Sequence, residues 1–298
     1  MAFLRLIKYP GAKSVLIPEI KRIFRSSGLH IFVDVFGGSG SVSLNVKADQ
    51  VVFNDYESEL ADMFRAIQEK SVEVRKMISK ILRYQDVKYG ISGTRRSLVS
   101  KTDQRGETLL VDAIERWEMS RRLLTKAGQA SLKRSLDLLS REEKAVFTIY
   151  RFSSSFGGMG NTYATAKEKS VHRYISMTLE NYAAIENAVK KWKIENMDFR
   201  DLIKKYDNSR TFFYLDPPYV GKQWYNYNFT KKDFVDIKTI LDTLNGKYLM
   251  NLNADVEYFK RIFGDPTFVK YYPNSNTKSD EKERRVREKG FYTNVKND

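Results

Sequence analysis

The chain has 298 residues, of which 52 are basic and 37 acidic, and its formal charge is +15. This balance favours a polyanionic partner, because Lys and Arg gain affinity by releasing counterions from phosphates. The absence of cysteine excludes disulfides, a thiolate nucleophile and cysteine zinc sites, and the presence of only two histidines argues against a histidine metal cluster, so we expect no metal. No apolar run reaches the length of a membrane span and the N-terminus lacks the core of a signal peptide, so we expect a soluble, cytoplasmic protein without a membrane partner.

The first part of the chain has an α/β pattern. Residues 31–36 form an apolar run that predicts a strand, a glycine turn follows at 37–41, and residues 42–46 look like the start of a helix. Glycine in such a turn lets the backbone approach a nucleotide closely, although neither G-x-G-x-x-G nor a P-loop lysine is present. A second strand at 51–53 is followed by Asp55, an acid placed to bind ribose hydroxyls.

The middle of the chain is helical, charged and poor in strand patterns from about residue 58 to residue 140. Ser140 and Glu143 have the spacing of a capping box, which predicts a further helix directly after them. A run of turn residues follows at 153–161. We therefore expect a helical insert that interrupts an α/β domain.

The last part again alternates strands and helices, with strands expected near 211–215, 247–252 and 267–272. Such alternation predicts a mainly parallel sheet with helices on its faces. The first of these strands runs into Asp216-Pro217-Pro218-Tyr219, where two prolines end the strand. A carboxylate, stiff carbonyls and an aromatic ring then meet at the carboxyl end of a strand, the edge where open α/β sheets bind ligands. A planar amine can bond the carboxylate and a carbonyl there while its ring stacks on the tyrosine.

Four motifs in a fixed order carry a resemblance to a known family. They are Lys8-Tyr9-Pro10-Gly11-Ala12-Lys13, Asp34-Val35-Phe36-Gly37-Gly38-Ser39-Gly40, Asn54-Asp55 and Asp216-Pro217-Pro218-Tyr219. Together they resemble the Dam-type (D12 class) adenine-specific DNA N6-methyltransferase family, over about the first 70 residues and most of the chain after residue 180. The resemblance implies that S-adenosyl-L-methionine is the cofactor and that a methyl group goes to the N6 amine of a flipped adenine in a specific double-stranded DNA sequence.

The resemblance also implies a fold, which is a Rossmann-like S-adenosylmethionine-dependent methyltransferase sheet with an inserted, mainly helical recognition domain. We expect a discontinuous catalytic domain at 1–60 and 165–298 and a target-recognition insert at 61–164. The insert is rich in basic residues that suit phosphate or guanine contacts. The candidates for contacting DNA are Arg95, Arg96, Arg105, Arg116, Arg121 and Arg122. The stretch 152–169 departs from the pattern of family members that read GATC, so a GATC target is not supported.

Each matching residue takes a role from the family. Asp216 would accept one N6 hydrogen, the Pro217 carbonyl would accept the other, and Tyr219 would stack on the base. The residues from Phe36 to Gly40 would line the methionine part of the cofactor, and Asp55 would take the ribose hydroxyls. Lys13 would meet the methionine carboxylate, and Asp198 with Phe199 would contact the adenine. The full predicted cofactor set is Tyr9, Lys13, Asp34, Phe36, Gly37, Gly38, Ser39, Gly40, Asp55, Asp198, Phe199 and Asp216.

Other functions stay open on sequence alone. N4-cytosine methyltransferases use an acid or serine before Pro-Pro-Tyr, and protein glutamine methyltransferases usually have asparagine at the position of Asp216. A catalytically inactive DNA-binding protein with this fold is a third alternative. A cognate restriction endonuclease is a candidate partner, and the sequence does not give the oligomeric state.

Overall fold

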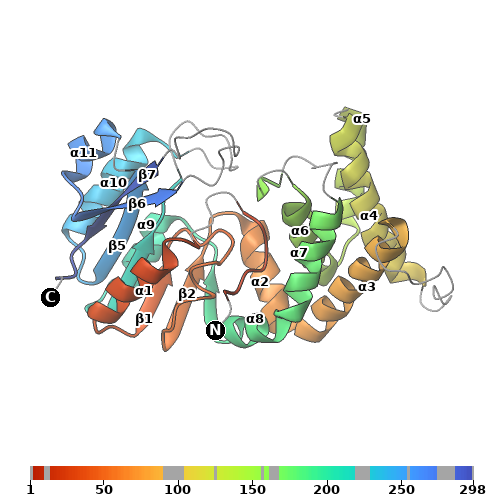
Figure 1. The fold of residues 1–298 in the computed structure, drawn as a ribbon, viewed down its shortest axis with the longest axis horizontal. Coiled ribbons are helices and arrows are strands. Elements are labelled where there is room, and N and C mark those ends of the chain that lie inside the picture. The colour runs from red at the N-terminus through yellow and green to blue at the C-terminus, as the bar shows by residue number, and fades with distance from the viewer. Residues whose placement is uncertain are drawn as a thin grey trace. The chain divides into compact units, whose positions relative to one another are not determined.

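The computed structural model describes residues 3–9, 14–89, 104–123, 126–155, 158–160, 168–218, 229–253, 256–273 and 286–296. The chain forms two compact units, each assembled from segments far apart in the sequence (Figure 1). We call them the helical unit, which comprises Met1–Ala12, Gly38–Leu44 and Ser58–Lys191, and the sheet unit, which comprises Lys13–Gly37, Asn45–Glu57 and Trp192–Asp298.

The sheet unit is built on seven described strands in the order β3-β2-β1-β4-β5-β7-β6. Their bounds are β1 Ile31–Asp34, β2 Gln50–Asn54, β3 Trp192–Glu195, β4 Thr211–Leu215, β5 Lys247–Asn253, β6 Phe268–Pro273 and β7 Val286–Thr293. The pairs among β3, β2, β1, β4 and β5 are parallel, whereas β7 runs antiparallel to both β5 and β6. The mainly parallel α/β sheet expected from the sequence is confirmed. The strand order reverses between β1 and β4, and such a switch point is where open α/β sheets bind ligands.

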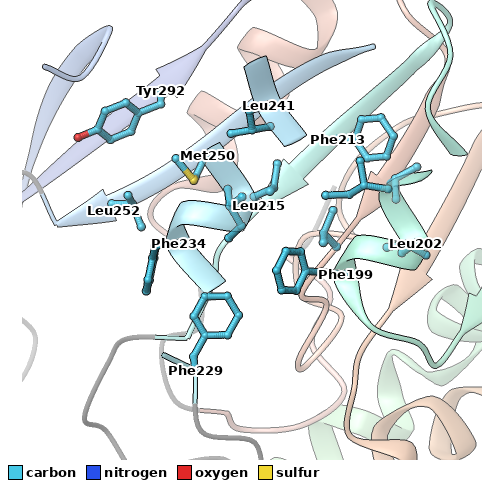
Figure 2. Close-up of a cluster of buried hydrophobic side chains, with 14 of the residues drawn as sticks. Phe199, Leu202, Phe213, Leu215, Phe229, Phe234, Leu241, Met250, Leu252 and Tyr292 are labelled. Carbon is cyan, nitrogen blue, oxygen red and sulfur yellow. The ribbon is translucent and has the colours of Figure 1, made fainter. Parts of the chain in front are cut away.

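Helices cover both faces of this sheet. The helices of the unit are α1 Ile17–Ser26, α9 Phe199–Tyr206, α10 Lys231–Asp242 and α11 Glu257–Phe263. On one face Phe24 of α1 packs edge-on against Phe32 and Phe212, with ring centroids 5.1 and 5.2 Å apart. On the other face Phe234 of α10 joins a buried cluster with Met250 and other side chains, shown in Figure 2. Because β4 is covered on both faces, every one of its residues is buried and apolar residues follow one another without alternation.

The helical unit contains seven helices among the described residues. Their bounds are α2 Ser58–Glu69, α3 Ser71–Tyr89, α4 Gln104–Leu123, α5 Lys126–Asp137, α6 Arg141–Ser154, α7 Glu168–Glu180 and α8 Tyr182–Val189. The capping box expected before α6 is present, since the Ser140 hydroxyl accepts from the Glu143 amide and the Glu143 carboxylate accepts from the Ser140 amide. No helix in the described parts of the chain is long and apolar enough to cross a membrane.

The helix expected at 42–46 is wrong. Residues 41–45 form turns, and the Leu44 amide donates to the Gly40 carbonyl. Gly40 has φ +67°, outside the right-handed helical region. The Ser39 and Ser41 hydroxyls bond each other at 2.6 Å, and serine side chains that bond locally compete with helix formation.

Candidate active site at the carboxyl edge of the sheet

Acidic side chains gather at the carboxyl ends of the central strands of the sheet unit. Asp34 ends β1, Asp55 follows β2 and Asp216 follows β4. β1 pairs in register with both β2 and β4, so these strand ends lie side by side. The Asp34 side chain is only 1% exposed, and a buried carboxylate persists only where hydrogen bonds or cationic groups offset its lost hydration. This edge therefore brings three carboxylates close together, and their contact with a cofactor stays a prediction.

The turn after β1 is fixed by Asn54 at the end of β2. The Asn54 amide nitrogen donates to the Val35 and Met197 carbonyls at 3.0 and 3.2 Å, and its oxygen accepts from the Met197 amide at 3.0 Å. The Gly37 amide donates to the Asn54 carbonyl at 2.7 Å. A Cβ atom at Gly37 would lie 2.2 Å from the Phe53 ring, so only glycine fits. Asn54 thus ties the glycine turn and the start of α9 to one strand end.

Asp55 is held in an Asx turn. Its Oδ1 accepts from the Glu57 amide at 2.9 Å, and its carbonyl accepts from the Asn196 side chain at 2.7 Å. These bonds fix the side chain at the carboxyl end of β2, where the sequence predicts contact with ribose hydroxyls. The structure thus provides a positioned carboxylate for that role, which stays a prediction.

Asp198 and Phe199 already have structural partners. Asp198 caps α9 by accepting from the Arg200 amide at 2.9 Å, and both of its carboxylate oxygens accept from Arg200 Nη1 at 3.1 Å. Phe199 is buried and packs against Phe36 and Phe229, and all three rings contact one another at centroid distances of 5.7 Å. Their predicted contact with a cofactor adenine stays a prediction, and Phe36 contributes to the core as well as to the turn.

Asp216 receives a hydrogen bond from the neighbouring strand. Asn251 of β5 donates from Nδ2 to Asp216 Oδ1 at 2.9 Å, and Asn251 Oδ1 accepts from the Tyr214 hydroxyl at 2.5 Å. Pro217, directly after Asp216, is buried. Tyr219 lies outside the described residues. The carboxylate that the sequence marks as catalytic is therefore oriented by a side chain distant in the sequence.

Gly38, Gly40 and Tyr9, which the sequence predicts to bind the cofactor, belong to the helical unit. A Cβ atom on Gly38 would lie 2.9 Å from the Tyr9 ring, and one on Gly40 would lie 2.6 Å from Phe64. The Tyr9 ring also packs on Phe152 of α6 at a centroid distance of 5.4 Å. Gly38 and Gly40 have φ of +52° and +67°, which favours glycine, so close packing and backbone conformation both explain them. Lys13 lies outside the described residues.

Comparison with known proteins decides the family. The family model for the D12 class N6 adenine-specific DNA methyltransferases matches residues 9–279. This chain belongs to that family. The modification methylase StsI of Streptococcus sanguinis is 37% identical over 62 residues, which are 21% of this chain and 9% of the relative. The chain therefore covers less than a tenth of that relative's length.

The arginines of this methyltransferase-family chain are only partly described. Arg95 and Arg96 lie outside the described residues, and Arg105, Arg121 and Arg122 lie on α4 at positions whose side chains are not described. Arg116 of α4 donates from Nε to Asp112 at 2.7 Å and from Nη1 to Ser131 of α5 at 2.5 Å. The hydrogen bond with Asp112 raises the pKa of Arg116 above its ordinary value. The predicted DNA contacts of all six stay predictions.

Sequence reasoning missed Asn251 and Arg200. Asn251 contacts Asp216 from 35 residues further along the chain, which no short motif reveals, whereas Arg200 contacts Asp198 from two residues away at the start of α9. The available signal for Asn251 is a polar residue inside the apolar strand pattern of β5, flanked by buried Met250 and Leu252. A buried polar residue in such a strand needs a partner, and here that partner is the candidate catalytic acid.

Proposed function

We propose that this protein transfers a methyl group from S-adenosylmethionine to the N6 amine of adenine within a specific duplex DNA sequence. The observation that carries the proposal is Asp216, held by Asn251 at the carboxyl end of β4 and followed by Pro217 and Pro218, in a chain of the D12 family. A carboxylate and a carbonyl side by side form an acceptor pair for the two hydrogens of an exocyclic amine.

The residues of the sheet edge suit S-adenosylmethionine. This cofactor carries a sulfonium and an ammonium group, and Asp34, Asp55 and Asp216 supply carboxylates at neighbouring strand ends. Asp55 would bind the ribose hydroxyls, while Phe36 and Gly37 would line the methionine part. The cofactor supplies an electrophilic methyl group, so the protein has to position the acceptor amine rather than form a covalent bond to it.

Groups of the protein then raise the reactivity of the amine. The N6 lone pair is delocalised into the adenine ring, which makes it a poor nucleophile. Asp216 accepts a hydrogen bond from one N6 hydrogen, and the Pro217 carbonyl accepts one from the other. Both hydrogen bonds strengthen as positive charge develops on the nitrogen. The target base first leaves the duplex, at a cost of about a few kcal/mol. Tyr219 stacks on the extruded base.

The helical segment 61–164 is the proposed target-recognition region, and double-stranded DNA is the proposed partner. The formal charge of +15 supports this partner, because phosphates attract an excess of Lys and Arg. The matched relative is named a modification methylase, which supports a restriction-modification context and a cognate endonuclease. The family match favours adenine over N4-cytosine, glutamine or an inactive fold.

The deciding experiment is to sequence modified bases in DNA from cells that express the protein or its Asp216→Ala variant. We expect N6-methyladenine in one short sequence motif with the parent and in none with the variant. N4-methylcytosine would replace the proposal with its main alternative. DNA without new modification, from cells that contain soluble protein, would refute both.

A further inference from the structure

We propose that Asn251 is a positioning residue for methyl transfer, which holds the Asp216 carboxylate in the orientation that receives the amine, and that Tyr214 in turn holds Asn251. The inference rests on the proposed function and extends it to two residues that lie outside the four recognised motifs. Asn251 Nδ2 donates to Asp216 Oδ1 at 2.9 Å, and the Tyr214 hydroxyl lies 2.5 Å from Asn251 Oδ1.

The chemistry of the three groups fixes the direction of both bonds. An ionised carboxylate only accepts hydrogen bonds, so the nitrogen side of the Asn251 amide has to face Asp216. The oxygen side then faces Tyr214, and an amide oxygen only accepts, so the tyrosine hydroxyl has to donate. The result is a directed chain from the Tyr214 hydroxyl through the Asn251 amide to the carboxylate.

The side chains that form these two hydrogen bonds, Asn251 and Tyr214, are buried. Asn251 is 0% exposed and Tyr214 is 1% exposed. Met250 and Leu252 belong to the buried cluster on one face of the sheet (Figure 2), so Asn251 between them points to the opposite face. Tyr214 lies on that face too, because its ring stacks on Phe32 at a centroid distance of 6.2 Å. Water therefore does not compete for these bonds, and the amide has little freedom to turn.

An apolar residue would satisfy this strand better than an asparagine. On its own face of the sheet, Asn251 lies beside Leu249 of β5 and opposite Phe291 of β7, both fully buried and apolar. A buried amide is tolerated only when its donors and acceptor are bonded, so its presence points to a task other than packing. The atom that it contacts is an oxygen of the carboxylate that would act on the amine.

The proposed effect is preorganisation. A carboxylate on a strand end can rotate about χ1 and χ2, and each wrong rotamer moves the acceptor away from the amine. A fixed donor at 2.9 Å selects one orientation before substrate binds, so no reorganisation is needed during transfer. Asn251 is therefore expected to affect kcat rather than the binding of cofactor or DNA.

The sharpest test replaces the amide by a carboxyl, Asn251→Asp, and compares it with Asn251→Leu over a range of pH. Two carboxyls in contact hold one proton between them, and that shared proton restores a donor to Asp216. As the pH rises the proton is lost, and two like charges then face each other. At acid pH we expect the kcat of Asn251→Asp to be within about 10-fold of that of the parent. The ratio of the two kcat values should then fall as the pH increases.

Asn251→Leu has no titratable group and no donor at any pH. We expect its kcat to be reduced by about 100-fold across the pH range, with the Kd for S-adenosylmethionine and for DNA changed less than about threefold. Asp34 of β1 and Lys289 of β7 carry charge on the strands beside β4 and β5, and Glu19 and Arg22 do so on α1. These groups are present in the parent and in every variant, so dividing the kcat of a variant by that of the parent at the same pH cancels their effect.

A matched pair of tyrosine variants tests the outer bond. Tyr214→Phe removes the hydroxyl that holds Asn251, and we expect kcat to fall roughly 3–10-fold. Tyr292→Phe is the control, because Tyr292 is also a buried strand residue of this sheet and its hydroxyl has no hydrogen-bond partner within the described part of the chain. Its kcat should equal that of the parent.

The outcomes separate this inference from the proposed function. A soluble parent protein without methyltransferase activity on any DNA refutes the function. An active parent with normal kcat in Asn251→Leu refutes the positioning role alone. Equal losses in Asn251→Leu and Asn251→Asp at every pH, with lowered unfolding temperatures, would assign Asn251 a structural role and overturn the inference.

Discussion

At the scale of the residue, each acid of the sheet edge has a different set of fixed partners. Asp55 is bonded to the Glu57 amide, Asp198 to Arg200 and Asp216 to Asn251. A short motif in the sequence predicts where such a carboxylate lies, because it follows directly from the end of a strand. The motif does not predict the partner of Asp216, because Asn251 lies on a different strand, 35 residues further along the chain.

The first prediction concerns Asp216. Asp216→Ala removes the acceptor of an N6 hydrogen but no phosphate contact. We expect kcat to fall by about 100–1000-fold, the cost of losing one preorganised group, while the Kd for DNA stays within about threefold. Single-turnover methylation and a gel-shift titration measure the two quantities. Near-normal turnover of the purified variant would remove Asp216 from the catalytic site.

Asp55 is expected to act on cofactor affinity instead. Asp55→Ala should weaken the binding of S-adenosylmethionine by about 1.5–3 kcal/mol, because bonds between a carboxylate and ribose hydroxyls are lost. Calorimetric titration measures this change. Asp49→Ala is the control, since Asp49 is an exposed acid next to the other end of β2. Equal Kd values for the parent and Asp55→Ala would exclude Asp55 from the pocket.

At the scale of the element, apolar pattern and turn chemistry predicted most of the structure. The strands near 211–215, 247–252 and 267–272 are present as β4, β5 and β6, and in β4 the apolar run reflects burial on both faces. The edge strand β3 was not predicted, since Trp192–Glu195 alternates apolar and charged residues over only four positions. The helix wrongly expected after the glycine turn shows that a local pattern fails where serine side chains bond one another.

The packing of α10 on the sheet leads to a stability prediction. Phe234 is fully buried in the cluster of Figure 2 and lies next to Val235, which is 49% exposed. Phe234→Ala leaves a cavity and should lower the free energy of unfolding by about 3–5 kcal/mol. Val235→Ala should change it by less than about 0.5 kcal/mol. Urea unfolding compares the two, and similar values would show that α10 does not depend on this contact.

Arg200 joins α9 to α10 through two acids of α10 and also bonds the N-cap acid of α9, and this leads to a pH prediction. It bonds Asp198, Asp233 and Asp236. Hydrogen bonds from Lys232 and then Arg200 lower the pKa of Asp236, and burial, which raises the pKa of Asp233, is outweighed by its bonds from Thr230 and Arg200. Because these pKa values lie below the ordinary 3.8, the stabilisation is complete above pH 3.8 and is lost as the pH falls through the lowered values.

Arg200→Met tests this dependence. We expect it to be less stable than the parent by about 1.5–3 kcal/mol at pH 7, the cost of losing charge-assisted bonds, and the difference should shrink as the pH falls below 3.8. Unfolding in urea between pH 7 and pH 2.5 measures the difference. A constant difference over that range would mean that Arg200 stabilises the unit through packing and not through its charge.

At the scale of the whole molecule, the order of the motifs predicted the family although the first and last motifs lie about 200 residues apart. The division into units was harder to predict, because each unit is assembled from three segments. The helical unit includes α7 and α8 as well as the segment 61–164, and it also includes Gly38–Leu44 from the glycine turn. A unit boundary depends on contacts between distant segments, which the local composition does not record.

The charge of the whole chain leads to the last prediction, which concerns DNA recognition. Alanine variants should be made at Arg95, Arg96, Arg105, Arg116, Arg121 and Arg122. Replacing an arginine that contacts a phosphate should weaken binding to all sequences alike and lower the salt slope by about one unit. Replacing an arginine that reads a guanine edge should instead reduce the specificity for one base of the methylated motif, by about 1–3 kcal/mol of discrimination. Arg116 needs a control because it bonds Asp112, so Asp112→Asn should reproduce any loss of stability without changing the salt slope. Unchanged salt slopes and methylation motifs in all six variants would place recognition outside α4 and the segment before it.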